Sequence, residues 1–298
     1  MTQTKDFSLS QDELDSFISL VTRTTGIIPR ESHKTGIKTY IEKILSKNSF
    51  TPSEYKHLLG TNPKLLSELI NASTVNETYF FREEKQFSIL KEKIFPQWKA
   101  SFGTMPIRVW SAACSYGEEA YSISLLAHEC GVTADITASD INSEVLEHCK
   151  TGIFLGSSIR QMDGQSFKNL LNDYQREDRK VKFPDHIKNS IHTKKINLAQ
   201  IDSQETESIL PKSQNIIFLR NVFIYFSQEL RARILRTISE KCMCDGGILF
   251  VSMSEIAQLD STVVPPSLET VMDGKVFYFT KKISSSGKTG VSNGKNFQ

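Results

Sequence analysis

The period of the hydrophobic positions divides the chain into two parts. From Ser10 to about Ala72 the apolar residues recur at helical spacing, as in the stripe Phe17, Leu20 and Val21, and this pattern is typical of helices that bury one face. Glycine or proline interrupts the pattern at Gly26, Pro29, Pro52, Gly60 and Pro63. Residues 1–73 are therefore predicted to form an all-α N-terminal domain.

Beyond a connecting segment at residues 74–95, short apolar runs alternate with helical stretches, a pattern that predicts a parallel sheet covered by helices. The expected strands are 107–113, 134–139, 215–226 and 247–252, and the expected helices are 120–130, 143–150 and 228–241. A last apolar run at 276–279 is expected to pair antiparallel with its neighbour. The sequence thus predicts an α/β domain over residues 96–283.

Two stretches depart from this alternation. Between Leu155 and Asn197 the chain is polar, with a short strand pair expected at 180–183 and 191–194, so a small β-insert is predicted at about residues 171–196. The tail, residues 284–298, is rich in Ser, Gly, Lys and Asn without apolar anchors and is expected to be disordered.

Composition and charge narrow the class of protein. A length of 298 residues allows two domains with real cores, and a net charge of +2 is too small to indicate a nucleic-acid partner. The N-terminus lacks the apolar core of a signal peptide, and the longest apolar run, 216–226, is too short to span a bilayer. The five cysteines lack metal-site spacing. We therefore expect a cytoplasmic protein with reduced thiols and no metal.

The junction between the first strand and helix of the α/β domain carries the clearest chemistry. The strand 107–113 leads through a loop with one glycine, Gly117, to Glu118 and Glu119 at the helix start. Asp140 follows the next strand, where dinucleotide-type folds place the acid that binds a ribose diol. Two carboxylates would repel a pyrophosphate but attract an ammonium or sulfonium group. S-adenosylmethionine carries both groups and is the predicted ligand.

The two acids of this helix start have a simpler alternative role. Acidic residues are common in the first turn of any helix, because they interact favourably with its dipole. Because Asp140 lies at the end of the next strand, we interpret Glu118 as a ligand contact. Glu119 is interpreted as an ordinary first-turn acid.

The helix expected at residues 31–47 has a basic side. Arg30, Lys34 and Lys38 are spaced by four and share a face, and Lys43 and Lys47 lie on the same helix. This face is either a solvated helix surface or a docking surface for an acidic helical partner.

Four segments together resemble the CheR-type chemoreceptor glutamate methyltransferases. They are Thr74–Glu83, with the pattern Asn-x-Thr-x-Phe-Phe-Arg; Trp110–Glu119, with Trp-Ser-Ala-Ala-Cys-Ser-x-Gly-Glu-Glu; Ala138–Asn142; and Phe218–Phe226, with Arg-Asn-Val-x-Ile-Tyr-Phe. The resemblance runs from about residue 10 to 282. It implies a Rossmann-like class I methyltransferase domain with a small β-insert, S-adenosylmethionine as cofactor and S-adenosylhomocysteine as product.

The resemblance also implies roles for single residues. Asn76, Thr78 and Arg82 would border the methionine end of the cofactor, and Glu118 would contact its amino-acid part. Asp140 would bind the ribose, and Asn197 with Leu198 would flank the adenine. Arg220 and Asn221 would form the floor of the pocket, and Arg82 and Tyr225 would lie near the transferred methyl group. Structural alternatives remain. Asn76 and Thr78 could cap a helix, and Tyr225 could be a core residue.

The implied reaction forms a methyl ester on glutamate side chains in the cytoplasmic helical region of chemoreceptors, during adaptation. Such a glutamate is ionised at neutral pH, so no general base is required. Arg82 is suited to orient its carboxylate, or else to bind the carboxylate of the cofactor. Arg30, Lys34, Lys38 and Lys43 would dock the receptor. No nucleic-acid partner and no membrane insertion are expected, and the protein is expected to be a monomer.

The sequence departs from the family pattern at two places. Ala120 stands where the family commonly has proline, and we expect no loss from this change. Members that tether to a receptor pentapeptide have a glycine-rich turn in the β-insert, whereas the stretch 171–181 contains no glycine. The sequence therefore predicts a pentapeptide-independent enzyme.

Two other functions stay open on the residues alone. A non-catalytic sensor could retain the cofactor site, although the presence of Arg82 and Tyr225 favours an enzyme. A nicotinamide-dependent dehydrogenase is disfavoured by the single loop glycine.

Overall fold

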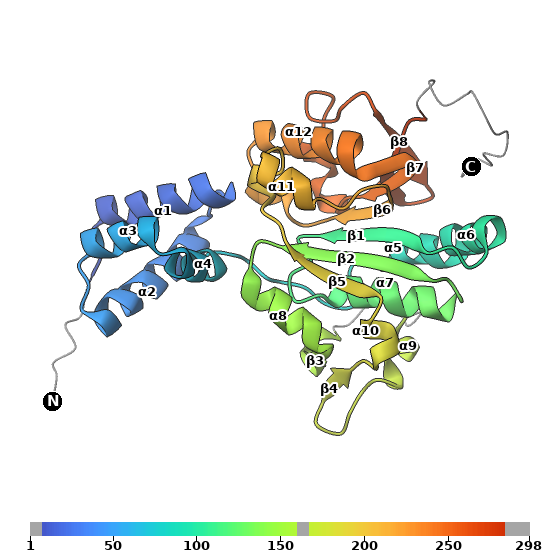
Figure 1. Ribbon diagram of the computed structural model, residues 1–298, viewed down its shortest axis with the longest axis horizontal. Coiled ribbons are helices and arrows are strands. Elements are labelled where there is room, and N and C mark those ends of the chain that lie inside the picture. Colours follow the sequence, from blue (N-terminus) through green and yellow to red (C-terminus); the bar gives the residue numbers. More distant parts are fainter. Residues whose placement is uncertain (1–7, 160–166, 284–298) are drawn as a thin grey trace.

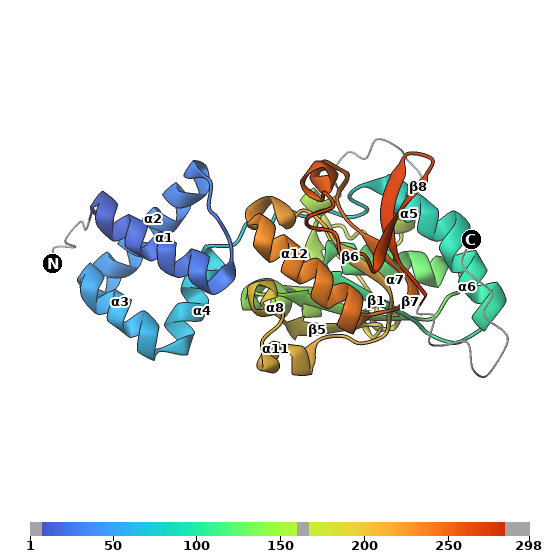
Figure 2. The ribbon, with the colours of Figure 1, turned by 90° about the horizontal axis from the view of Figure 1, so that it is seen from above.

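The computed structural model describes residues 8–159 and 167–283, which form a helical part and an α/β part (Figure 1). The helical part consists of α1 (Gln11–Thr25), α2 (Glu31–Asn48), α3 (Pro52–Thr61) and α4 (Pro63–Ala72). Figure 2 shows these helices grouped beside the α/β part and joined to it by the segment before α5. Their apolar faces meet in a core that includes Phe17, Val21, Ile37, Ile41, Leu45, Tyr55 and Leu69. The predicted all-α character of this part is confirmed.

The ends of these helices follow from local chemistry. The side chains of Ser10 and Thr51 each accept a hydrogen bond from the backbone N–H of a glutamate three residues later. The side chain of that glutamate accepts a hydrogen bond from the backbone N–H of the serine or threonine, which completes a capping box. Pro52 and Pro63 occupy first helical positions, where proline costs no hydrogen bond. Gly26 ends α1 with φ of 72°. Gly60 lies inside α3 and does not interrupt it.

The α/β part is built on a seven-stranded sheet with the order β5-β2-β1-β6-β7-β9-β8. The strands are β1 (Ile107–Ala112), β2 (Ala134–Asp140), β5 (Ile191–Lys195), β6 (Gln214–Leu219), β7 (Met243–Phe250), β8 (Leu268–Asp273) and β9 (Val276–Lys281). The first five strands of this order are parallel, and β9 runs antiparallel to both β7 and β8. This is the predicted α/β, Rossmann-like architecture, including the antiparallel last strand.

Alternate residues of the central strands face two separate cores. Val109 packs with α7 (Glu118–Glu129), α5 (Glu84–Ile89) and α6 (Phe95–Phe102), whereas the neighbouring Trp110 packs with α12 (Gln228–Thr237). Figure 1 shows α12 on one side of the sheet and α7 on the other. α8 (Ser143–Thr151) connects β2 to the small two-stranded sheet. Because both faces are covered, the ends of the strands are where the sheet is left open for a ligand.

The expected pairing of strands 180–183 and 191–194 was wrong. β4 (Lys180–Lys182) pairs antiparallel with β3 (Ile153–Leu155) to form the small sheet. β5 instead extends the main sheet, parallel to β2. Phe154 and Val181 lie opposite each other in β3 and β4, and both are buried. Side chains from elsewhere in the chain, including Phe80, complete this small core, so the polar local pattern could not reveal the pairing.

The expected strand 215–226 was too long. β6 ends at Leu219, after which Asn221 adopts a left-handed backbone with φ of 58° and Phe223–Tyr225 forms a 3-10 turn. The apolar side chains that suggested a continuing strand are those of this buried turn. β8 was not expected, since it is an edge strand in which only Leu268 is buried. The predicted disorder of 284–298 lies outside the described residues.

Candidate active site

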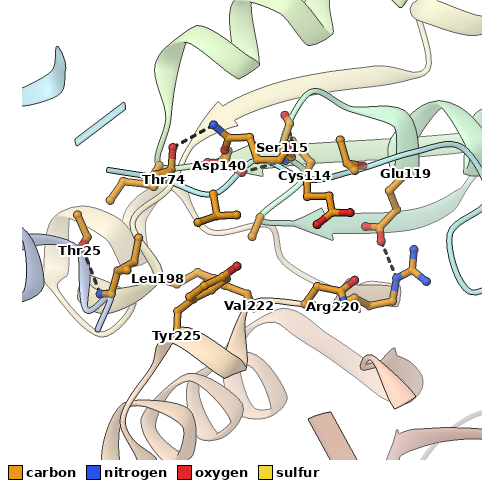
Figure 3. Close-up of a pocket in the computed structure, with 18 of the residues that line it drawn as sticks. Thr25, Thr74, Cys114, Ser115, Glu119, Asp140, Leu198, Arg220, Val222 and Tyr225 are labelled. Atoms are coloured by element: carbon orange, nitrogen blue, oxygen red, sulfur yellow. Dashed lines mark hydrogen bonds and ion pairs between the residues drawn. The ribbon is translucent and has the colours of Figure 1, made fainter. Parts of the chain in front are cut away.

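A cleft opens at the carboxyl ends of β1, β2 and β6 (Figure 3), which is where open α/β sheets bind ligands. Its walls are built by the loops after these strands and after β5, by residues 74–79 and Arg82 of the connecting segment, and by the helical part. The helical part contributes Thr25, Ile27 and His33. In Figure 3, Thr25 and Leu198 lie at one end of the cleft, and Glu119 and Arg220 lie at the other.

The β1–α7 loop is shaped by its backbone. Ala113 and Ser115 have φ values of 57° and 52°, which non-glycine residues rarely adopt. Gly117 has φ of 103°, and a Cβ atom there would collide with the Cys149 thiol. The loop therefore needs its single glycine for close packing against α8 and turns its backbone N–H groups toward the end of β2.

Asp140 is fixed by that backbone. Its two carboxylate oxygens accept hydrogen bonds from the backbone N–H groups of Ser115 and Asn142, both at 2.9 Å. The residue is 8% exposed and lines the cleft. Burial raises the pKa of the Asp140 carboxyl, and the two backbone hydrogen bonds oppose that rise. A carboxylate held this rigidly can accept two hydroxyl groups of a ribose.

Glu119 is more than a first-turn acid, and that interpretation was wrong. One oxygen accepts a hydrogen bond from Arg220 Nε at 2.7 Å and the other from the Ser111 hydroxyl at 2.6 Å. The Arg220–Glu119 ion pair is almost fully buried, and Glu119 itself lines the cleft. Both oxygens are thus occupied by the protein, and the charge of Glu119 is balanced by Arg220.

Glu118 is buried behind the cleft wall and is absent from the cleft lining. One oxygen accepts a hydrogen bond from the Ser158 hydroxyl at 2.8 Å. The other, Oε2, has no hydrogen-bond partner among residues 8–159 and 167–283. Burial raises the pKa of Glu118, while the Ser158 hydroxyl acts in the opposite direction. A buried carboxylate oxygen without a partner is costly and suits a cationic ligand group.

Arg220 and Asn221 form the floor of the cleft where β6 ends. Arg220 donates from Nη1 to the carbonyl oxygen of Arg82 at 2.6 Å and to Gln86 Oε1 at 3.2 Å. Its guanidinium therefore joins the β6 loop to the segment that carries Arg82. The Asn221 amide donates to the Ser252 hydroxyl at 3.0 Å. Both residues line the cleft, the position that the family resemblance implied for them.

Arg82 and Tyr225 both line the cleft. Arg82 donates to the carbonyl oxygen of Glu77 at 2.9 Å and lies 5.6 Å from the centre of the Tyr79 ring. Tyr225 is half-buried, and burial raises the pKa of its hydroxyl while the charges of Arg30 and Arg82 lower it. In Figure 3 the Tyr225 ring lies across the cleft from Asp140. Tyr225 is therefore a cleft residue, although part of its ring also packs in the core.

The other predicted contacts lie where the cleft meets the helical part. Asn76, Thr78, Asn197 and Leu198 all line it. Asn76 and Thr78 cap no helix, because the next helix begins at Glu84. The Asn197 amide nitrogen donates to the carbonyl oxygen of Thr24 at 2.7 Å, and its oxygen accepts from the N–H of Ala199 at 3.0 Å. The side chain of Asn197 thus connects this end of the cleft to α1.

The basic helix does not present its charges on one face. Lys34 pairs with Glu31 at 2.7 Å, and Lys38 lies 3.7 Å from Glu42. Arg30 precedes the first turn of α2. Lys43 is exposed, but nine positions of about 100° each place it on the opposite side of the helix from Lys34. Of the four predicted docking residues, only Arg30, Lys34 and Lys38 share a side.

Several residues of the site were not predicted. Glu255 is fully buried beneath the β6 loop, and Glu83 contacts the loop after β7. The signal for Glu255 was available, since it belongs to a polar stretch, Ser252–Glu255, directly after a predicted parallel strand. His33 had no such signal. Its burial lowers the pKa of the imidazole.

Some observations bear on other kinds of site. Within residues 8–159 and 167–283, no group of three or more His, Cys, Asp or Glu side chains is arranged to hold a metal ion. The five cysteines are free thiols. No helix in the same described ranges has the length and apolar character that crossing a membrane requires.

Comparison with known proteins agrees with this geometry. Residues 76–271 match the family model described as CheR methyltransferase, SAM binding domain. The chemotaxis protein methyltransferase of Borreliella burgdorferi is 30% identical, over 82% of this chain and 88% of that protein. The Campylobacter jejuni protein of the same description is 31% identical over 85% and 91%, and chemotaxis protein methyltransferase 1 of Vibrio cholerae is 29% identical over 83% and 90%. The chain therefore belongs to the CheR family of S-adenosylmethionine-dependent methyltransferases.

Proposed function

We propose that this protein transfers the methyl group of S-adenosylmethionine to glutamate side chains in the cytoplasmic helical region of chemoreceptors, and that it acts in the cytoplasm as a monomer. The observation that carries the proposal is the pairing of a rigid diol acceptor, Asp140, with an arginine and a tyrosine on the lining of the same cleft. Such an arrangement can hold a nucleoside while a carboxylate approaches from outside.

The residues present fit the cofactor. Asp140 would bind the ribose hydroxyls. The buried carboxylate of Glu118, with Thr78 beside it on the cleft lining, would attract the ammonium group from behind the cleft wall. Leu198 and Asn197 would flank the adenine at the end nearest α1. When bound, S-adenosylmethionine supplies a methyl group activated by its positive sulfur. Asn76 and Arg220 would complete the walls.

The protein's own contribution to catalysis is positioning. A receptor glutamate arrives ionised, so no side chain has to remove a proton. Arg82 would orient its carboxylate through two parallel hydrogen bonds, and Tyr225 would hold the opposite side of the approach. The buried ion pair between Arg220 and Glu119 keeps the floor rigid without placing a net charge there.

The proposal is tested by incubating the protein with receptor-containing membranes and methyl-labelled cofactor. Base-labile label on the receptor is the expected result, because a glutamate methyl ester hydrolyses in base. A protein that binds the cofactor but labels no receptor would instead be a sensor with a retained cofactor site. A heat-inactivated sample provides the control for label that attaches without catalysis.

We also propose that the enzyme needs no C-terminal receptor pentapeptide. The turn that connects Gln175 to β4 is closed by a hydrogen bond from the N–H of Arg176 to the carbonyl oxygen of Lys180 at 2.8 Å, and Arg179 adopts the left-handed conformation with φ of 59°. This turn carries charged side chains, whereas the family resemblance implies a glycine-rich turn in members that tether to a receptor pentapeptide. Removing the receptor tail should leave the methylation rate unchanged. A micromolar affinity for the free pentapeptide would contradict this proposal.

The basic side of α2 is proposed to dock the glutamate-rich receptor helix. Lys34→Glu with Lys38→Glu should raise the Michaelis constant for receptor, leave cofactor affinity intact and flatten the dependence of rate on ionic strength. Each exposed pair contributes only about 0.2–1 kcal/mol, so the double variant is needed. Steady-state rates at low and high salt measure the effect.

The opposite side of the same helix provides a matched control. Lys43→Glu with Lys47→Glu changes the net charge equally, but both residues are exposed on the other side of α2. Equal effects of the two double variants would show that only net charge matters, and the docking surface would have to be abandoned.

A further inference from the structure

Three loops meet beneath the floor of the cleft. The first, 81–86, carries Arg82, and the second, 220–225, carries Asn221 and Tyr225. The third, 252–255, follows β7 and contributes no residue to the cleft lining. Even so, two of its polar side chains, those of Ser252 and Glu255, are buried. Ser252 is 1% exposed and Glu255 is 0% exposed.

Glu255 binds the backbone of the second loop with both oxygens. Oε2 accepts a hydrogen bond from the N–H of Asn221 at 2.8 Å, and Oε1 accepts one from the N–H of Ile224 at 3.2 Å. Asn221 precedes the 3-10 turn Phe223–Tyr225, and Ile224 is the middle residue of that turn. Asn221 itself has φ of 58°, in the left-handed region that asparagine adopts more readily than most residues with a side chain. The carboxylate therefore connects the left-handed residue Asn221 to the turn that carries Tyr225.

Ser252 connects this loop to the one that carries Arg82. Its hydroxyl accepts a hydrogen bond from the Asn221 amide at 3.0 Å and donates to Glu83 Oε1. The other oxygen of Glu83 accepts from the N–H of Met253 at 3.2 Å. Glu83 directly follows Arg82 in the chain. A single short segment after β7 thus holds both loops that supply the proposed catalytic side chains.

We propose that Glu255 is a positioning residue, which fixes the 220–225 loop so that Tyr225 and Asn221 hold the geometry needed for methyl transfer. This inference rests on the proposed function. A fully buried carboxylate is costly unless it is bonded on every side, so its presence here is explained by the backbone that it organises. Glu255 touches neither cofactor nor substrate and acts only through the loop.

The test replaces Glu255 by glutamine, which keeps the size but offers one acceptor where two are used. The amides of Asn221 and Ile224 should exchange with deuterium faster by about tenfold, the effect of losing one backbone hydrogen bond. The turnover number should fall by about ten- to a hundredfold, because small displacements at a reacting centre are costly. Cofactor affinity should change less than turnover. Glu255→Asp, which keeps the charge, should restore part of the turnover.

Asn215→Ala is the matched control. Like Glu255, Asn215 accepts a hydrogen bond from a backbone N–H group, that of Arg108 at 2.9 Å. Asn215 lies at the start of β6, at the end of the sheet opposite the cleft. This variant should lower the melting temperature without changing turnover. If Glu255→Gln behaves like Asn215→Ala, or if its loop amides exchange at the wild-type rate, Glu255 is only structural and the proposal is overturned.

The remaining outcomes are also decisive. Should Glu255→Gln fail to fold, the same measurements on Glu255→Asp decide, and failure of both variants to fold overturns the positioning role in favour of a general structural one. If the wild-type protein labels no receptor, the proposed function fails by itself, and the amide exchange still shows whether Glu255 holds the loop.

Discussion

Asp140→Ala is expected to weaken S-adenosylmethionine binding on the order of 30-fold. The carboxylate ends β2, lines the cleft and is held by two backbone N–H groups at 2.9 Å. Its loss would remove a pair of charge-assisted hydrogen bonds to the ribose, worth on the order of 2 kcal/mol. Titration calorimetry with cofactor and with S-adenosylhomocysteine measures the change, and the product should be affected to the same extent.

Asp135→Ala serves as its control. Asp135 lies on the same strand but near its other end, where it is exposed and 3.6 Å from His192 Nε2. This variant should bind cofactor normally. Unchanged affinity in Asp140→Ala would remove the ribose assignment, whereas a similar loss in both variants would indicate that β2 tolerates neither substitution.

Arg82→Ala is expected to lower the turnover number by about a hundredfold at saturating cofactor, and Tyr225→Phe by a smaller factor. Both residues line the cleft, and the charge of Arg82 acts on the Tyr225 hydroxyl. A positioned guanidinium that orients the receptor carboxylate contributes mainly after the cofactor has bound. Cofactor affinity should therefore change less than turnover. Single-turnover methylation with bound cofactor separates the two steps.

Arg82→Lys distinguishes the two possible jobs of this side chain. Lysine keeps the positive charge but cannot grip a carboxylate through two parallel hydrogen bonds. Turnover should remain well below the wild-type value if Arg82 orients the receptor. If Arg82→Ala and Tyr225→Phe lose only cofactor affinity, with normal turnover at saturation, both residues belong to cofactor binding and the catalytic assignment fails.

Much of the fold could be predicted because its signals are local. The strand, loop and helix around Gly117, and the acid at the end of the next strand, occupy neighbouring positions in the chain, and hydrophobic period alone identifies them. The partner strands of β4 and of β5 could not be predicted. Both strands are short and largely charged, and their partners are fixed by a core whose aromatic side chains come from distant segments.

The candidate site shows the same division. Asp140 and Arg220 follow from motifs, and the structure places both on the cleft. Glu119 was misinterpreted because its partner, Arg220, lies 101 positions further along the chain. The position of Glu255 after a predicted strand was a usable signal, but its partners, the backbone N–H groups of Asn221 and Ile224, belong to another loop and could not be predicted. Sequence patterns show which residues are available, but partners far apart in the chain decide what those residues do.

Residues of the helical part form one wall of the cleft, and this limits how the protein can be re-engineered. Thr25 and Ile27 line the site from outside the matched methyltransferase segment, and Asn197 is bonded to Thr24. A chimaera that took residues 1–73 from a relative would therefore also replace this part of the cleft wall. Exchange of the helical part and alteration of the cleft are therefore not independent changes in this chain, and selection on one constrains the other.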